Sequence, residues 1–176
     1  SRHVIIRLNM SVRKVIQAGD PKLKAKNKTV SNYKSPNIQK LIKDLISTNK
    51  SADLIGIAST QIGENYTVFI THCVNTKARK LGKTDKLRVY INPEITYESK
   101  KQNLIYEGCG SVANGAIFGP VLRSQKIEVV AIDEKGQKFS LRANGILARV
   151  IQHEYDHLQG IEFLQKVSDY SKIVVQ

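Results

Sequence analysis

The feature that most constrains the fold of this chain is an apolar segment close to its carboxyl end. Its apolar residues recur at helical spacing, and Asn144-Gly145 and Gly160 supply a start and a stop signal. The periodic apolar positions are Ile146, Leu147, Val150, Ile151 and Leu158. Because these positions cover several sides of the helix, we expect a central helix that the rest of the chain buries.

The same segment contains a motif that can do chemistry. Residues 153–157 read H-E-x-x-H, and residues four apart lie one turn above each other on the same helix face. His153 and His157 can therefore point at one ion, with Glu154 beside a bound water. Such an ion lowers the pKa of the water, and the carboxylate takes and delivers the proton. The alternative is a helix with two hydrogen-bonded histidines and a surface glutamate.

A catalytic site of this kind needs a third protein ligand and an open position. In metzincins a third histidine follows downstream, but Phe163 occupies that place here, and Glu162 is too close to the motif. The ligand must come from upstream, and Cys109 is the strongest candidate. It lies between two glycines, where the backbone can approach a metal closely. The alternative is a buried, inert thiol.

The other elements predict an α+β domain. Ser35 as N-cap and Pro36 at the first helical position begin an amphipathic helix that should end near Asn49. Strands are expected at 66–71, 88–91, 127–132 and 138–142, and residues 133–136 form a hairpin turn between the last two. We expect mixed or antiparallel strands packed around the central C-terminal helix. Residues 11–33 should be irregular and residues 79–86 a mobile loop.

Composition limits the partners and the compartment. The formal net charge of +13 suits proximity to a polyanion such as a ribosome, although a non-specifically basic surface explains it equally well. No aromatic-rich RNA signature accompanies the charge, so specific nucleic-acid readout is not expected. Two cysteines predict no disulfide framework, and we interpret Cys73 and the adjacent His72 as structural. No apolar run approaches the length of a membrane span, so no membrane association is expected.

Met10 is the only methionine of the chain, so we expect it to be the native start. Residues 1–9 would then be an expression remnant or the stub of a processed leader, and residues 10–176 a single domain. The expected location is the cytoplasm, or an organelle stroma or matrix if residues 1–9 are the remnant of a leader.

Three segments resemble the peptide deformylase family, and they occur in the family's order. Residues 56–61 are similar to G-φ-A-A-x-Q, where φ is apolar, residues 107–111 to E-G-C-φ-S, and residues 152–160 to Q-H-E-x-D-H-L-x-G. The resemblance runs over almost all of residues 10–167. It implies an enzyme that removes the N-formyl group from the N-terminal methionine of nascent polypeptides and releases formate.

The resemblance also implies roles for single residues. One divalent ion would be bound by Cys109, His153 and His157; it is usually ferrous iron in the cell, and zinc or nickel can replace it. Glu154 would be the general acid and base, and the oxyanion would be stabilised by the amide of Gln61 and the backbone N–H of Gly110. The substrate backbone would pair with Ile55 and Gly56. The methionine side chain would be received by Ile105, Leu147 and Val150.

Three positions depart from the family pattern. Leu54 stands where a glycine is usual, Gly110 where a leucine is usual, and Ala113 where a proline is common. Gly110 keeps its N–H but adds backbone freedom, which predicts a slower enzyme and a faster Gly110→Leu variant. The departures at Leu54 and Gly110 leave open a hydrolase for a different acyl group. The net charge leaves open a catalytically silent RNA- or ribosome-binding module with a structural metal.

Overall fold

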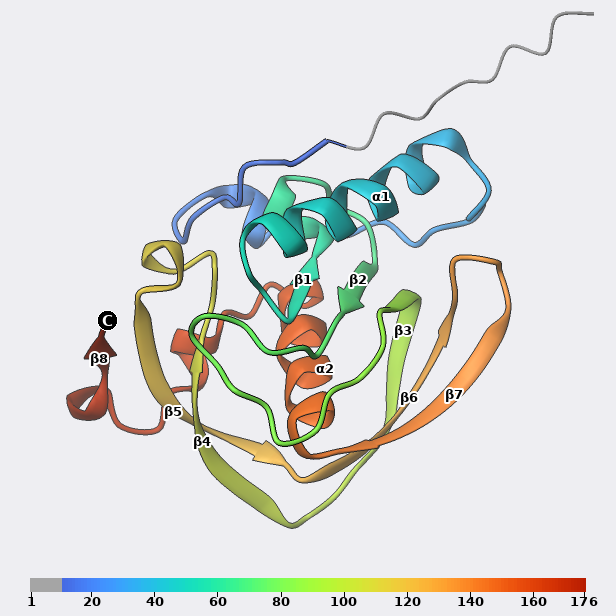
Figure 1. Cartoon of the computed structure of the whole chain (residues 1–176). Helices are drawn as coiled ribbons and strands as arrows, with labels where there is room; N and C mark the ends of the chain where they lie inside the picture. The colour runs from blue at the N-terminus through green and yellow to red at the C-terminus, as the bar shows by residue number, and fades with distance from the viewer. Residues whose placement is uncertain (1–10) are drawn as a thin grey trace, which may run out of the picture.

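The computed structural model describes residues 11–176, so the expectations for residues 1–9 and for Met10 as the native start lie outside it. Two antiparallel sheets surround the helix α2 (Gly145–Leu158), and α1 (Pro36–Ser51) covers one side of the larger sheet (Figure 1). The predicted α+β class with antiparallel sheets is confirmed. Within residues 11–176 no helix has both the length and the apolar character needed to cross a membrane.

The strands divide between the sheets as follows. The larger sheet has the order β1-β2-β3-β6-β7, with β1 (Gly56–Ala58), β2 (Val68–Thr71), β3 (Arg88–Glu98), β6 (Lys126–Ile132) and β7 (Lys138–Asn144). The smaller has the order β4-β5-β8, with β4 (Gln102–Gly108), β5 (Ile117–Ser124) and β8 (Val174–Val175). Short 3-10 turns are η1 (Pro21–Leu23), η2 (Ser59–Ile62), η3 (Ala113–Gly115), η4 (Phe163–Lys166) and η5 (Tyr170–Lys172).

The strand predictions were incomplete: the short strands β1 and β8 were not predicted, and two longer segments also differ. Strand β3 continues to Glu98, past Asn92 and Pro93, because a register shift between Ile91 and Glu94 accommodates the proline. The hairpin of β4 and β5 was not predicted at all. A Gly119-Pro120 pair lies inside β5, and both residues weaken the strand signal.

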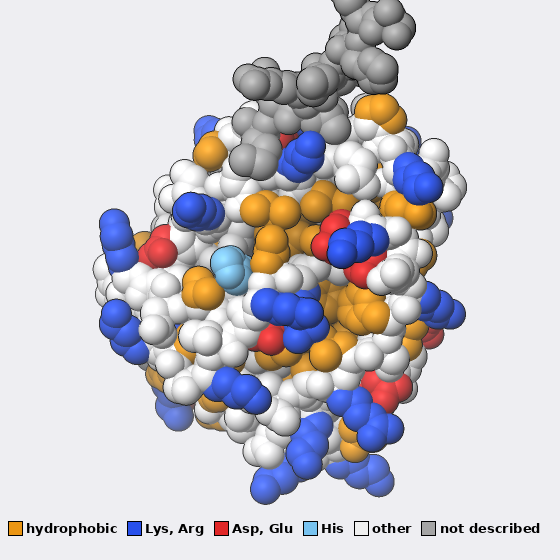
Figure 2. Space-filling model, turned by 45° about the vertical axis from the view of Figure 1, so that its right-hand side comes forward, with side chains coloured by type: hydrophobic (Ala, Val, Ile, Leu, Met, Phe, Trp, Pro, Cys, Tyr) orange, Lys and Arg blue, Asp and Glu red, His pale blue; other side chains and the backbone are white. Residues whose placement is uncertain are grey.

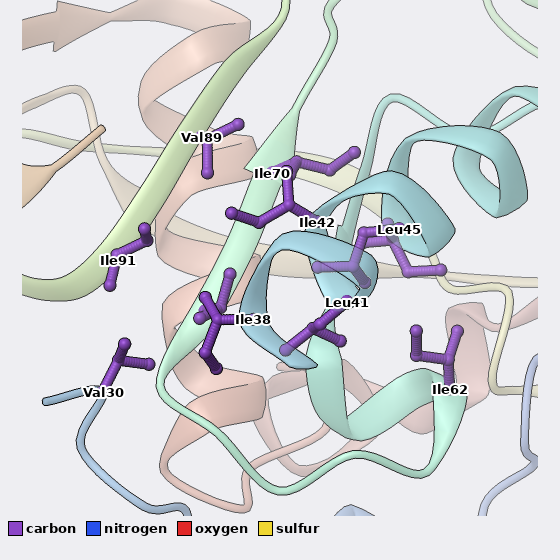
Figure 3. Close-up of a cluster of buried hydrophobic side chains, with 11 residues drawn as sticks. Val30, Ile38, Leu41, Ile42, Leu45, Ile62, Ile70, Val89 and Ile91 are labelled. Carbon is purple, nitrogen blue, oxygen red and sulfur yellow. The ribbon is translucent and has the colours of Figure 1, made fainter. Parts of the chain in front are cut away.

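Helix α1 stabilises the sheet through one apolar face. Ser35 caps it by accepting a hydrogen bond from the Ile38 amide, as the sequence predicts. Figure 3 shows that this face packs against side chains of β2 and β3. The cluster includes Ile38, Leu41, Ile42, Leu45, Ile70, Val89 and Ile91. A second cluster, which includes Phe69, Tyr90 and Ile151, fills the space between the sheet and α2.

Asp44 fastens the amino-terminal segment to α1. Its carboxylate is 1% exposed and accepts hydrogen bonds from the Ser11 amide at 3.0 Å, Arg13 Nη1 at 3.3 Å and Lys40 Nζ at 2.6 Å. Burial by itself raises the pKa of Asp44, but the hydrogen bonds from Lys40, Ser11 and Arg13 outweigh it and lower the pKa below its usual value.

We predict that Asp44→Ala lowers the free energy of unfolding by about 1–3 kcal/mol, because the donors lose a buried acceptor. Since folding lowers this pKa, the carboxylate stabilises the fold above the ordinary Asp pKa of about 4, and the contribution disappears as the pH falls through the folded-state pKa. Urea unfolding of both proteins at several pH values measures the difference, which should shrink on acidification. The control Glu134→Ala, in the exposed hairpin turn, should change stability by less than about 0.5 kcal/mol; equal effects of the two substitutions would contradict the prediction.

Candidate active site

Helix α2 places three polar side chains in the interior of the molecule. His153, Glu154 and His157 are all buried, and the two imidazole rings lie 5.1 Å apart between their centres. Buried polar groups of this kind need partners. Within residues 11–176, however, neither Glu154 Oε2 nor His157 Nδ1 has a hydrogen-bond partner. Glu154 therefore has a carboxylate oxygen that the donors of these residues do not satisfy, whereas His157 Nδ1 lies on the ring edge opposite the Nε2 that faces Cys109.

Cys109 meets the two histidines directly after β4. Its Sγ lies 3.3 Å from His157 Nε2, and the ligating atoms of Cys109, His153 and His157 all lie within 4.8 Å of one another. The structure therefore brings together the three residues that the sequence analysis assigned to a metal. A thiolate and two imidazoles are a donor set that binds zinc or iron.

The Glu107 carboxylate orients His153 and holds it to the smaller sheet. His153 Nδ1 donates to Glu107 Oε1 at 2.9 Å, so in the neutral ring Nε2 carries the lone pair that a metal ligand needs. Arg123 donates to both oxygens of the same carboxylate at 3.0 Å, and Arg149 Nη1 to Oε2 at 2.5 Å. Arg123 also pairs with Asp156 on α2. Burial raises the pKa of Glu107, but the bonds from His153 and Arg123 lower it far below its usual value.

Burial and neighbouring charges shift the pKa values of the two histidines in opposite directions. Burial by itself lowers the pKa of His153, but the neighbouring Cys109 thiol and the hydrogen bond to Glu107 raise it well above its usual value. Burial and the nearby charge of His153 lower the pKa of His157 well below its usual range, so this ring is neutral. Burial raises the pKa of Glu154 to about 7, which suits a group that exchanges protons near neutral pH.

The amide of Gln61 has a fixed orientation. Its Oε1 accepts from the Ala58 amide at 2.9 Å, and its Nε2 donates to Ser111 Oγ at 3.1 Å and to Cys109 Sγ at 3.4 Å. Because the backbone N–H of Ala58 can bond only to the carbonyl end, the NH₂ end must face the cysteine loop. Gln61 thus presents a donor beside the three candidate ligands.

Strand β1 approaches α2 so closely that only glycine fits at residue 56. A Cβ at Gly56 would lie 2.7 Å from Val150 Cγ1 and 2.9 Å from Glu154 Oε1. These are shorter than ordinary van der Waals contacts, so a side chain here would displace the candidate acid and base.

A pocket opens above these groups. Of the residues expected there, its lining includes Gln61, Gly110, Ile55, Gly56 and Val150, together with Cys109, His153 and Glu154. The structure places Leu147 instead against the second core cluster, and it leaves Ile105 on β4 with 40% of its surface exposed. The lining residues that the sequence analysis did not assign to the pocket are Leu54, Arg79, Glu107, Gly108, Ile146 and Arg149.

Two of these residues had a signal in the sequence. Arg149 is a charged residue in a helix predicted to be buried, and a buried charge requires a partner of opposite sign. Glu107 is part of the segment that contains Cys109. Their pairing could have been inferred, although not its geometry. Arg79 lies in the segment between β2 and β3, where nothing in the sequence marks it out.

Cys73 and His72 lie apart from the candidate metal group. Among residues 11–176 that group consists of Cys109, His153 and His157, and burial raises the pKa of the Cys73 thiol to about 12. A thiol that keeps its proton is a poor ligand, which agrees with the structural role expected for Cys73.

The loop after Cys109 takes a course that proline cannot follow. Ala113 has a φ of +47° and Asn114 a φ of +52°, whereas proline fixes φ near −65°. The departure at Ala113 is therefore a consequence of the local backbone. Two residues earlier the loop is held by the Ala18 amide, which donates to Ser111 O at 2.7 Å.

Comparison with known proteins agrees with the fold. A peptide deformylase of Pseudothermotoga lettingae is 36% identical over 94% of this chain and 88% of its own. The chloroplastic peptide deformylase 1B of Solanum lycopersicum is 32% identical over 89% of this chain and 53% of its own. The crystal structure of an Acinetobacter baumannii peptide deformylase with bound Met-Ala-Ser is 28% identical, with a TM-score of 0.85 over 90% of this chain and 100% of that one.

The sequence profile of the polypeptide deformylase family matches residues 12–172. That span includes the larger sheet, strands β4 and β5 of the smaller sheet, both α-helices and every side chain of the candidate site. The chain therefore belongs to the peptide deformylase family, enzymes that act on formyl-methionyl peptides.

Proposed function

We propose that this chain holds one divalent metal ion through Cys109, His153 and His157 and removes the N-formyl group from the N-terminal methionine of nascent polypeptides. The observation that carries the proposal is the convergence of one sulfur and two imidazoles within 4.8 Å at the base of an open pocket. Three protein ligands and an accessible position are typical of catalytic rather than structural sites.

The donor set fits such an ion. The Nδ1 of His153 is engaged by Glu107 at 2.9 Å, an arrangement that fixes a metal-binding imidazole from behind. The low pKa of His157 keeps that ring in the neutral form that binds a metal. We propose ferrous iron as the ion in the cell, as the family resemblance implies, and zinc or nickel as substitutes, because thiolate and imidazole donors accept all three.

Glu154 would transfer the proton between the attacking water and the leaving amine. A divalent cation at this site would supply Lewis acidity and lower the pKa of a water molecule towards neutrality. Glu154 would accept a proton from the attacking water and then deliver it to the leaving amine. Its burial and its unpartnered Oε2 within residues 11–176 are consistent with this role.

Two donors would stabilise the oxygen of the formyl group as it gains negative charge. These are Gln61 Nε2, held in place by Ala58 and Ser111, and the backbone N–H of Gly110, which lines the same pocket. Donors that are fixed before the reaction stabilise the transition state without reorganisation.

The substrate backbone would enter between two sheet edges. In the described part of the chain β1 and β4 are both edge strands, and residues at or beside their ends line the pocket. Ile55 and Gly56 would pair with the peptide in the manner of an added strand. The apolar wall formed by Ile55, Ile146 and Val150 would receive the methionine side chain.

We further propose that residues 10–176 act as one domain, which the match of the family profile to residues 12–172 supports. Lys and Arg side chains are spread over the whole visible face in Figure 2. With the net charge of +13, this distribution supports a loose electrostatic approach to a ribosome. We propose the cytoplasm as the location; the organelle alternative has a chloroplastic relative in its favour.

The activity is tested by formate release from a formyl-methionyl tripeptide with iron- or nickel-loaded protein. We expect turnover by the wild type, a loss of about 100-fold or more in kcat for Glu154→Ala, and a loss of about 100- to 1,000-fold for Gln61→Ala. The acetyl-methionyl tripeptide is the matched substrate control and should not be cleaved. Absence of formate from the loaded wild type would remove the proposal, and preferred cleavage of the acetyl peptide would replace it.

The role of Glu107 predicts an effect on metal affinity. Glu107→Gln should weaken binding of zinc by about 10- to 100-fold, because His153 loses the carboxylate that fixes its ring. Competition with a chelator measures the affinity, and circular dichroism confirms that the variant is folded. Glu128→Gln, which removes a surface carboxylate paired with the exposed Arg142, is the control and should bind zinc like the wild type. Equal affinities of all three proteins would refute the role of Glu107.

A further inference from the structure

Two of the family departures, Leu54 and Gly110, touch each other in the fold. A Cβ built on Gly110 would lie 3.2 Å and 3.4 Å from the two δ-carbons of Leu54, and 3.6 Å from Val15 Cγ1. The Leu54 side chain therefore already fills the space into which a side chain at residue 110 would extend.

The backbone itself does not require glycine at residue 110. Its φ lies outside the left-handed region, unlike that of Gly115 at +83° in the same loop, so an L-amino acid could adopt this conformation. What restricts the position is space, and Leu54 supplies the nearest contact.

Leu54 is held rigidly by the end of α1. The Leu54 amide donates to Asn49 O at 3.0 Å, and Asn49 Nδ2 donates to Leu54 O at 2.9 Å. The Leu54 side chain also packs against the first core cluster. These hydrogen bonds and the core packing fix the position of the Leu54 side chain.

The Gly110 peptide is anchored by a second contact. Gln17 Nε2 donates to Gly110 O at 2.8 Å, while the Oε1 of the same side chain accepts from the Asn114 amide at 2.9 Å. Leu54, Gly110 and Gln61 line one pocket. A glycine in this setting has much less freedom than its lack of a side chain suggests.

We infer that Leu54 is a positioning residue for the Gly110 N–H. The family usually has glycine at position 54 and leucine at position 110, and in this chain the two residue types are exchanged. The side chain that packs over the oxyanion loop comes from residue 54 instead of residue 110. This inference rests on the proposed function. It also reverses the effect expected for Gly110→Leu, which now places two leucines in one space.

A four-protein cycle tests the exchange: wild type, Leu54→Gly, Gly110→Leu and the double variant. Leu54→Gly and Gly110→Leu should each lower kcat by about tenfold or more. Leu54→Gly leaves the loop of Gly110 unsupported, and Gly110→Leu displaces that loop. The double variant should return to within about threefold of wild type, because contacting residues are coupled. KM should change less than about twofold, since the loss lies in the transition state.

A control variant, a milder cycle and a second readout separate positioning from general damage. Gly82→Leu adds a leucine where a Cβ meets nothing within 4 Å, outside the candidate site, and should keep kcat. If Gly110→Leu does not fold, the cycle of Leu54→Ala with Gly110→Ala makes the same comparison. Thermal unfolding of the four proteins supplies a second readout, in which the double variant should again recover.

The inference would be overturned if the losses in kcat of the two single variants multiplied in the double variant. A Gly110→Leu enzyme that is faster than the wild type would also overturn it. If the loaded wild type released no formate, the proposed function would fail on its own. Recovery of the unfolding temperature in the double variant would then still support the exchange, and additive losses of temperature would overturn it.

Discussion

The Glu107 carboxylate is the contact on which the site depends, because it joins the smaller sheet to α2 and orients a candidate ligand. Through Arg123 it is tied to β5, and through His153 and Arg149 to α2. Cys109 follows two residues later, so the strand that carries the carboxylate also sets the position of the sulfur. The register between β4 and β5, in which Glu107 pairs with Gly119, is therefore a condition for assembling the three ligands.

A buried cluster of this kind opposes folding unless every charge is compensated. Two carboxylates, Glu107 and Asp156, balance the guanidinium groups of Arg123 and Arg149. The thiol and the two imidazoles are then left for a cation. Of the five buried side-chain atoms that lack a partner within residues 11–176, Glu154 Oε2 belongs to a residue that lines the pocket. Charge compensation in the surrounding shell thus leaves the metal site as the place where an external group is needed.

The sequence predicted the cluster of candidate ligands better than it predicted the surroundings. Helical spacing was enough to place His153 beside His157, and elimination of downstream ligands was enough to select Cys109. The sequence analysis named Leu147 for the pocket wall, whereas the neighbouring residue Ile146 lines the pocket and Leu147 packs against the second core cluster. Successive residues of a helix point about 100° apart, and a helix apolar on several sides gives no signal for which side faces a pocket. The hairpin of β4 and β5 was missed because exposed Leu104, Tyr106 and Leu122 remove the alternation that marks a half-buried strand.

The departures from the family pattern show why single positions are poor guides to function. Considered alone, Gly110 predicts a loosened donor, and Leu54 with Gly110 leaves open a different acyl substrate. In the structure their volumes are complementary, with contacts of 3.2 Å and 3.4 Å at a virtual Cβ. Packed interiors conserve total volume more strictly than they conserve the identity of each side chain. A lost side chain on one segment can therefore be supplied by another segment far away in the sequence, and only a structure reveals which segment supplies it.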